Sequence, residues 1–125
     1  MAGNLTLREQ IARYIKKAKG ISCDVEQIYI YSGTQHHLQE VCKFFGRVEV
    51  AIEEPGFKRA TAVFKQNNLN LHHIPIDEKG ATIPFIPCKL YYITPAHQFP
   101  LGGIMPGERR LSLLQWAQEA KAYLI

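Results

Sequence analysis

The sequence has few cysteines, no long apolar run and no block of like charge. Its three cysteines, Cys23, Cys42 and Cys88, lie far apart without C-x-x-C spacing, which indicates reduced thiols and no disulfide framework or zinc site. No apolar run approaches the ~20 residues that a membrane span requires, and the N-terminus lacks the layout of a signal peptide. We therefore expect a cytoplasmic protein with no membrane partner.

The charge and composition indicate a globular protein. The formal net charge is +4, but the basic residues come in small groups such as Lys16 and Lys17 or Arg109 and Arg110, interrupted by apolar positions. This pattern favours solvated helix faces over a nucleic-acid surface. With 46% hydrophobic and 21% charged residues and no repeats, the chain is expected to fold as one domain spanning residues 1–125.

Helical periodicity appears in four segments. A capping box T-L-R-E from Thr6 predicts a first helix that Gly20 ends. Its expected inner stripe is Leu7, Ile11, Tyr14, Ile15 and Ala18. A second helix is predicted around Leu38, Val41, Cys42 and Phe45, and a third over residues 57–66 with Ala60, Val63 and Phe64 inward. The last helix is expected to start at Pro106 and to be defined by Leu111, Leu114, Ala117 and Ala120.

Short β-rich segments alternate with these helices. Strands are predicted over residues 27–31, 48–52, 69–76 and 90–93, and residues 123–125 look like the start of another. Such alternation predicts an α/β fold with a mostly parallel sheet and flanking helices. Ligands of such folds bind outside the carboxyl ends of the strands, so the loops that follow residues 31, 52 and 93 are the candidate site.

The first candidate loop contains Ser32, Gly33, Thr34 and Gln35. A glycine before a helix start lets backbone N–H groups and the helix dipole face an anion, with hydroxyl groups nearby, so phosphate is the natural ligand. Most turns of this composition merely cap a helix, and taken alone this loop favours that interpretation.

The other two loops carry an aromatic residue, a histidine and an amide. Phe57 follows a Pro-Gly turn, where its ring can either stack on a flat ligand or enter the core. Gln98 can donate to a charged oxygen, and His97 can act as an acid, base or hydrogen-bonding group. The pairs His36-His37 and His72-His73 lack a partner at metal-ligand spacing, so we predict no metal site.

Taken together, the three loops resemble a known family. The segments LREQIARYIKKAKGISCDVEQIYIYSGTQHHL, VAIEEPGFKRA, IPIDEKG, YYITPAHQFPLGGIM and RRLSLLQWAQEAKAYLI resemble the aminotransferase-like domain of the MocR subgroup of GntR-type transcriptional regulators. That domain is related to the fold-type I pyridoxal 5'-phosphate (PLP) aminotransferases. The resemblance implies that the chain is part of the large domain of the PLP-dependent transferase fold.

The resemblance also implies roles for the loop residues. Gly33 and Thr34, beside Ser32 and Gln35, would hold the cofactor phosphate. Phe57 matches the aromatic residue that stacks on the pyridine ring. In the third loop, Gln98 would lie near the phenolic oxygen of the ring, and His97 would shape the loop.

The departures from the family pattern limit what is expected of this chain. The aspartate that pairs with the pyridine nitrogen and the lysine that forms the Schiff base are absent, and none of the nine lysines lies in a matching motif. We therefore expect no catalytic residue and weak or no PLP binding by this chain. The winged helix of the regulators is also missing, so DNA is expected to be a partner only through a domain absent here.

One strand lacks its family neighbour. The resemblance implies that residues 27–31 lie beside strands that come later in sequence than this chain extends. An unpaired apolar strand invites association, so a homo-oligomer or a rearranged sheet is expected.

The sequence leaves three functions open. The chain is first interpreted as a fragment of a regulator's PLP-binding domain, which in the full-length protein responds to a small amino acid or amine. The alternatives are a fragment of a genuine class I/II PLP-dependent aminotransferase of amino-acid metabolism, or a stand-alone interaction module.

Overall fold

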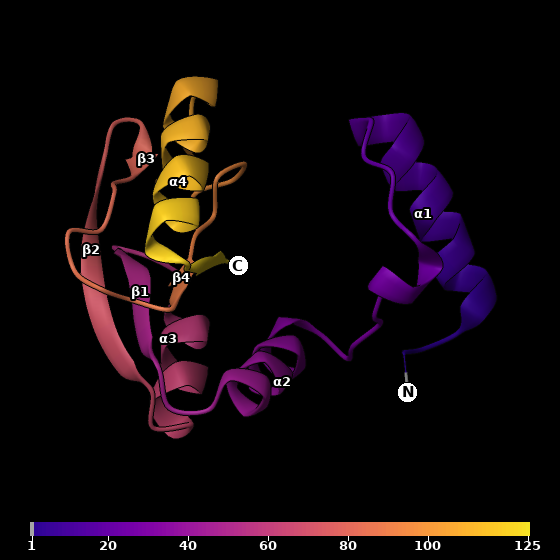
Figure 1. The fold of residues 1–125 in the computed structure, drawn as a ribbon, viewed down its shortest axis with the longest axis horizontal. Helices are drawn as coiled ribbons and strands as arrows, with labels where there is room; N and C mark the ends of the chain where they lie inside the picture. The colour runs from indigo at the N-terminus through magenta and orange to yellow at the C-terminus, as the bar shows by residue number, and fades with distance from the viewer. Residues whose placement is uncertain (1) are drawn as a thin grey trace. The chain divides into compact units, whose positions relative to one another are not determined.

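The computed structural model describes residues 2–125, which fall into two compact units that divide between His37 and Leu38 (Figure 1). The first unit contains helix α1 (Leu5–Lys19) and a short 3₁₀ helix η1 (Val25–Gln27). The Asn4 side chain caps α1 by accepting a hydrogen bond from the Leu7 N–H (3.0 Å), and Gly20 ends the helix in a left-handed conformation, φ 69°. The predicted capping box at Thr6 is wrong, because the helix already begins at Leu5.

The predicted inner stripe of α1 is not a buried face. Leu7 and Tyr14 are exposed, and Arg8 is the buried residue of this helix. The Arg8 guanidinium donates to the Val25 carbonyl (3.1 Å), so a polar contact fastens η1 to α1. Apolar periodicity predicted the helix correctly, but it did not predict which of its residues are buried.

The predicted strand over residues 27–31 is wrong. Gln27 ends η1, and residues 28–31 are extended without joining the sheet. The Ile30 N–H donates to the carbonyl of Ala2 (3.0 Å), which is an isolated bond and not a ladder. Among residues 2–37 the structure contains no strand with which this segment could pair. A β-rich composition therefore produced extended backbone only, because a strand also needs a neighbour.

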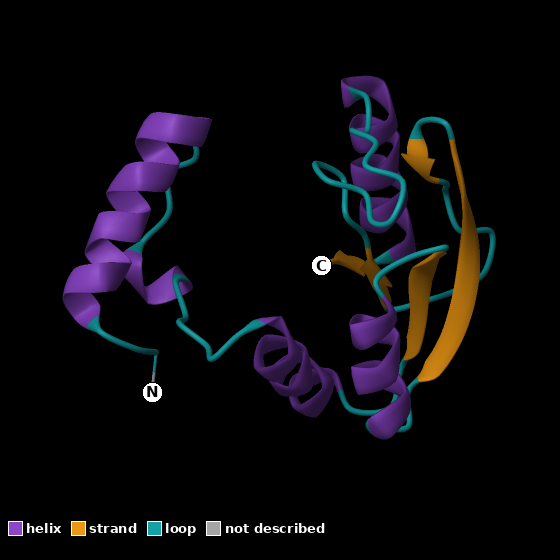
Figure 2. Cartoon of the chain, turned by 180° about the vertical axis from the view of Figure 1, so that it is seen from behind, coloured by secondary structure: helices purple, strands orange, loops and turns teal. Residues whose placement is uncertain are grey.

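The second unit is built on a five-stranded sheet. Its strands are β1 (Glu49–Glu54), β2 (Asn70–Asp77), β3 (Gly80–Ala81), β4 (Leu90–Tyr92) and β5 (Tyr123–Leu124), in the order β3-β2-β1-β4-β5. Only β3 is antiparallel to its neighbour. The long, curved β2 is plain in Figure 2. This confirms the predicted α/β fold with a mostly parallel sheet and the approximate positions of β1, β2, β4 and β5, whereas no strand was predicted at β3.

Three helices accompany these strands. They are α2 (Thr34–Phe45), which begins at the end of the first unit, α3 (Lys58–Gln66) and α4 (Gly107–Ala120). As predicted, α2 buries Leu38 and Cys42. The predicted inner face of α3 is confirmed as well, since its buried residues are Ala60, Val63 and Phe64.

Alternate residues of the strands face two separate cores. Val50, Ile52 and Leu90 pack with the buried faces of α2 and α3. Ala51 and Tyr91 belong to the second cluster, which includes Leu113 of α4 and Met105. Successive residues of a strand point to opposite faces, so helices cover both sides of the sheet. Burial on both faces explains why β1 reads as a continuous apolar run.

The inner face of α4 differs from the prediction. Leu113 and Ala117 are buried, whereas Leu111 and Leu114 are more than half exposed. Three leucines within four positions fit more than one helical stripe, so the pattern alone did not choose between them. Pro106 is the N-cap of α4 and not its first helical residue.

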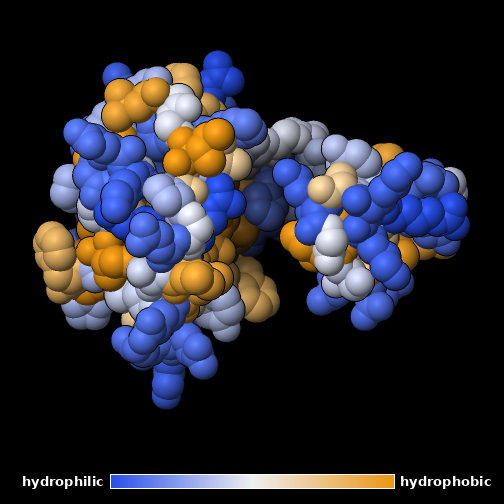
Figure 3. All heavy atoms as spheres, turned by 90° about the horizontal axis from the view of Figure 1, so that it is seen from above, coloured by the Kyte–Doolittle hydropathy of each residue, from blue (hydrophilic) through white to orange (hydrophobic). Residues whose placement is uncertain are grey.

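Apolar and polar side chains are interspersed on the surface seen in Figure 3. The exposed apolar side chains of the second unit include Phe44, Phe85, Phe99, Ile104 and Leu111. Within residues 2–125, none of the helices has both the length and the apolar character to cross a membrane.

Candidate functional site

Two of the three predicted loops meet at one edge of the sheet. Strands β1 and β4 are parallel neighbours, with Val50 opposite Leu90 and Ile52 opposite Tyr92. The turn at residues 55–57 follows β1 and leads into α3, and the β4–α4 loop (residues 93–106) follows β4. Because parallel strands end at the same edge, the two segments lie side by side, as the sequence predicted.

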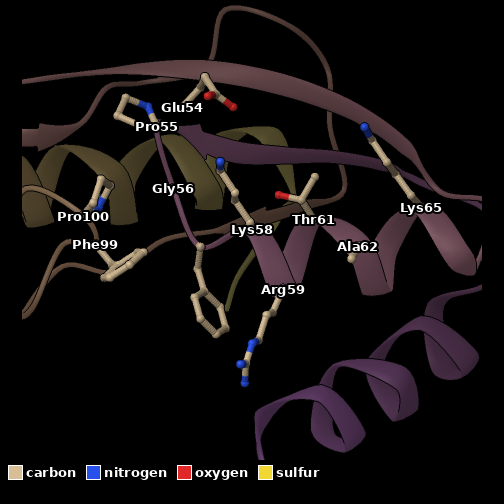
Figure 4. Close-up of a pocket in the computed structure, with 11 residues that line it drawn as sticks. Glu54, Pro55, Gly56, Lys58, Arg59, Thr61, Ala62, Lys65, Phe99 and Pro100 are labelled. Carbon is tan, nitrogen blue, oxygen red and sulfur yellow. The ribbon is translucent and has the colours of Figure 1, made fainter.

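A hollow of about 770 Å³ lies beside these two segments, and we call it the β1–β4 hollow. It is lined by Glu54, Pro55, Gly56, Phe57, Lys58, Arg59, Thr61, Ala62, Lys65, Phe99 and Pro100. Figure 4 shows Phe99 and Pro100 on one side and Lys58, Arg59 and Lys65 along the helix on the other. All lining residues belong to the second unit.

The apolar wall of the hollow contains two aromatic rings. Phe57 and Phe99 meet edge to face, with ring centroids 6.2 Å apart and an interplanar angle of 88°. Phe57 is partly buried and packs against the core of the second unit, and its stacking on a flat ligand stays a prediction. Phe99 is more than half exposed. The Phe57 ring is thus held by the core, whereas the Phe99 ring lies on a loop and is exposed to solvent.

The other wall of the hollow is cationic. Lys58, Arg59 and Lys65 lie on α3, and in the described part of the chain none of them forms an ion pair. The first turn of α3 contains no acidic residue, and the N-cap, Phe57, offers no side-chain cap. The one carboxylate of the lining, Glu54, is hydrogen-bonded to His73 Nδ1 (2.8 Å). The hollow therefore favours a ligand that is flat and negatively charged.

Next to the lining residue Glu54 lies a buried polar group, Glu53, to which the sequence assigned no role. The Glu53 carboxylate, in a residue only 3% exposed, accepts hydrogen bonds from the Thr94 N–H (2.9 Å) and the Thr94 hydroxyl (2.6 Å). The amide of Gln98 also donates to it, at 3.3 Å. An acidic residue that follows the apolar run of residues 50–52 was the available signal.

Gln98 lies within this network. It is buried, and its side-chain amide also donates to the carbonyls of Pro55 (3.0 Å) and Phe99 (2.8 Å). Its Oε1 accepts a hydrogen bond from the Leu101 N–H (3.0 Å). A direct contact between Gln98 and a cofactor oxygen stays a prediction, and it would compete with these bonds. Its neighbour His97 is exposed on the same loop.

The predicted phosphate loop lies at the boundary of the first unit. Ser32, Gly33, Thr34 and Gln35 are all exposed, and α2 begins at Thr34, as the sequence predicted. Gly33 has φ 93°, and open space surrounds the position where a Cβ would lie. The Ser32 hydroxyl is 2.8 Å from His36 Nδ1. A left-handed glycine before a helix leaves the backbone N–H groups of the first turn accessible, which suits an anion.

The paired histidines of β2 have structural partners. His72 Nε2 is hydrogen-bonded to the Glu49 carboxylate, to which Asn70 also donates. Two hydrogen bonds lower the pKa of Glu49, and the one from the Asn70 amide has a larger effect than the one from His72. Within residues 2–125 no group of three potential ligands is placed to hold a metal ion.

Comparison with known proteins identifies relatives for the whole chain. No family model matches it. The chain is 39% identical over 127 residues to the uncharacterized HTH-type transcriptional regulator YdeL of Bacillus subtilis, covering 98% of the chain and 27% of that protein. It is 29% identical to the HTH-type pyridoxine biosynthesis transcriptional regulator PdxR of Corynebacterium glutamicum, covering 98% and 28%. It is also 29% identical to the probable rhizopine catabolism regulatory protein MocR of Rhizobium meliloti, covering 100% and 26%.

The fold is similar to that of solved aminotransferases. A Pyrococcus horikoshii kynurenine aminotransferase superposes with a TM-score of 0.88 at 27% identity, covering 98% of this chain and 34% of that one. LysN, the α-aminoadipate aminotransferase of Thermus thermophilus, superposes with a TM-score of 0.84 at 26% identity, covering 99% and 33%. The chain spans about a quarter of the length of the curated relatives. It is a partial aminotransferase-like domain with the PLP-dependent transferase fold, and its sequence relatives are HTH-type regulators of the MocR kind.

Proposed function

We propose that this chain supplies part of the PLP-binding site in the effector domain of a MocR-type transcriptional regulator. The observation that carries the proposal is the β1–β4 hollow, whose lining combines the aromatic rings of Phe57 and Phe99 with the basic side chains of Lys58, Arg59 and Lys65. PLP is a flat ring that carries negative charge, so the aromatic rings suit it and the basic side chains of α3 attract it. Regulators among the relatives and aminotransferases among the structural matches support the same assignment.

Within this proposal, each loop has one task. The backbone N–H groups at Gly33 and Thr34, with the Ser32 hydroxyl and Gln35 nearby, would bind the phosphate, as anions bind at helix N-termini. The ring of Phe57 would support the pyridine ring by stacking. His97 would shape the β4–α4 loop, and Gln98 would lie near the phenolic oxygen of the ring. When bound, PLP supplies an electron-withdrawing ring to an amino compound, and this chain supplies contacts that orient it.

No residue of the hollow is proposed as a Schiff-base lysine. Lys58 and Lys65 lie on the hydrophilic side of α3, without the sequence motif that surrounds the PLP lysine in the family. We therefore expect reversible binding of PLP and no specific covalent adduct. In the longer regulator, the proposal adds a small amino acid or amine as effector, DNA bound by another domain, a homo-oligomer and a cytoplasmic location.

The test is a PLP titration of the full chain, followed by absorption and by mass spectrometry after borohydride reduction. We expect weak, saturable, phosphate-dependent binding, and only scattered labelling of lysines. Phe57→Ala should weaken the binding about tenfold or more, a loss of ~1.4 kcal/mol or more that is consistent with one lost ring contact. The matched control is Phe85→Ala, because Phe85 is 84% exposed and does not line the hollow. Equal affinity of the two variants would contradict the proposal.

An alternative function is part of a genuine PLP-dependent aminotransferase, and the solved structures of similar fold favour it. The named sequence relatives favour the regulator, since all are HTH-type or MocR proteins. The neighbouring DNA sequence distinguishes the two. An upstream reading frame for a winged helix supports the regulator, and an enzyme is expected to lack it.

A further inference from the structure

The Glu53 carboxylate is buried without a cation. It lies at the end of β1 after the fully or nearly buried residues Val50, Ala51 and Ile52. In the part of the chain that the structure describes, no lysine, arginine or histidine forms an ion pair with it. Burial of an unpaired charge is costly unless hydrogen bonds replace the lost water. A glutamate at this position therefore needs strong hydrogen-bond donors around it.

Among the described residues, the groups that donate hydrogen bonds to its carboxylate all come from the β4–α4 loop. The Thr94 N–H binds Oε1 at 2.9 Å, and the Thr94 hydroxyl binds Oε2 at 2.6 Å. Gln98 Nε2 donates to the same Oε2 at 3.3 Å. Hydrogen bonds to a charged acceptor are about twice as strong as neutral ones, so one side chain of β1 fastens the loop at two points.

Gln98, which is bonded to Glu53, in turn restrains the backbone at Phe99. Its amide donates to the carbonyl of Phe99 at 2.8 Å and to that of Pro55 at 3.0 Å, and its Oε1 accepts from Leu101 at 3.0 Å. The loop therefore closes around the Gln98 side chain. Phe99, held between these bonds, is the ring that meets Phe57 edge to face in the apolar wall of the hollow.

The turn on the other side of the hollow also rests on Glu53. A Cβ added at Gly56 would overlap the carbonyl oxygen of Glu53 and approach its Cβ at 3.1 Å. The turn therefore packs directly on the backbone of Glu53, one residue before Phe57. Both aromatic residues of the hollow are thus placed by segments that contact the same glutamate.

We propose that Glu53 is a positioning residue of the β1–β4 hollow: through Thr94 and Gln98 it fixes the loop that holds Phe99 against Phe57. The use of this wall for PLP rests on the proposed function, whereas the restraint itself does not. In Glu53→Gln the shape is kept, but an N–H₂ group replaces one oxygen. In either orientation that group meets a donor, the Thr94 N–H or the Gln98 amide, so one of the two attachments of the loop is lost. Turning the Gln98 side chain over would break its bonds to Pro55, Phe99 and Leu101.

The experiment compares Glu53→Gln with Glu78→Gln, a change at an exposed glutamate of the turn after β2. Amide hydrogen exchange and contacts between the two rings are measured by NMR on the full chain without ligand. We expect Leu101 to exchange about tenfold faster or more in Glu53→Gln, with β1 and β2 amides unchanged, and the contacts between Phe57 and Phe99 to weaken. Glu78→Gln should match the unaltered chain.

Unchanged protection of Leu101 with intact ring contacts would overturn the proposal. A uniform rise of exchange through the whole unit would also overturn it, because it would indicate general destabilisation. Should Glu53→Gln fail to fold, Thr94→Val removes only the hydroxyl donor, and it should raise the Leu101 exchange rate by a smaller factor. PLP affinity is measured in parallel. A loosened loop with no PLP binding by any variant would support the positioning role and contradict the proposed function.

Discussion

Gly56→Ala is the substitution that most directly tests the packing beneath the hollow. The added Cβ would overlap the carbonyl oxygen of Glu53 and lie 3.1 Å from its carbonyl carbon. These are backbone atoms at the end of β1, and they cannot turn away as a flexible side chain can. Since φ at Gly56 is not positive, the cost is steric and not conformational. The turn must therefore move away from the strand.

The size of the effect follows from two opposing contributions. Forcing one methyl group into a packed site costs roughly 1–3 kcal/mol. Loss of backbone freedom in the unfolded chain returns about 0.4–1 kcal/mol for a change from glycine to alanine. We therefore expect a net destabilisation of about 1.5 kcal/mol. With a urea m-value of about 1 kcal/mol/M for a unit of this size, the unfolding midpoint should fall by roughly 1.5 M.

Trp116 provides the assay. It is the sole tryptophan and packs against Tyr91 in the second unit, with ring centroids 5.9 Å apart, so its fluorescence follows the unfolding of this unit. Gly103→Ala is the matched control, because a Cβ there would meet nothing within 4 Å and φ is not positive. The control should unfold at the same urea concentration as the unaltered chain or slightly above it. Equal midpoints for the two variants would refute the reasoning about the turn.

Two further predictions concern titratable groups. Burial raises the pKa of the Cys42 and Cys88 thiols, so a thiol reagent should label the partly exposed Cys23 first. In denaturant, all three cysteines should be labelled at similar rates. Early labelling of Cys42 in the folded chain would contradict the packing of α2. The hydrogen bond from Arg109 (2.8 Å) lowers the pKa of Asp77 in the folded chain. The ionised Asp77 therefore stabilises the fold above the pKa that it has in the unfolded chain, and this stabilisation is lost as the pH falls through its pKa in the folded chain. In Asp77→Asn, the free energy of unfolding should therefore fall less steeply as the pH drops below about 4, and near neutral pH it should be lower by under about 1 kcal/mol. The same dependence of stability on acid pH in the variant and the unaltered chain would contradict this.

Local patterns were sufficient to predict much of the second unit. The spacing of Ala60, Val63 and Phe64 matched one face of a helix, and that face is buried in α3. Apolar runs around Val50 and Leu90 matched strands that are covered on both faces. In each case the burial follows from residues close in sequence. Such patterns also predicted which strand ends carry the turn at residues 55–57 and the β4–α4 loop.

Features that depend on distant partners were not predicted. The segment at residues 27–31 has a strand-like composition, and the family resemblance implied that it lacks its neighbouring strands, but local sequence did not show that it would stay outside the sheet. The role of Glu53 depends on Thr94 and Gln98, which lie more than forty residues further along the chain. The family resemblance implied a contact between Gln98 and the phenolic oxygen of the cofactor. The structure places its amide among acceptors of the protein itself.

The most direct test of the central claim is an NMR titration of the ¹⁵N-labelled chain with PLP. We expect the amides of Gly33, Phe57 and Phe99 to shift along one common saturation curve with PLP, and inorganic phosphate to shift Gly33 but not Phe99. Shifts confined to exposed lysines, or a Phe57 amide that does not respond to PLP, would contradict the claim that these loops serve a flat phosphorylated ring.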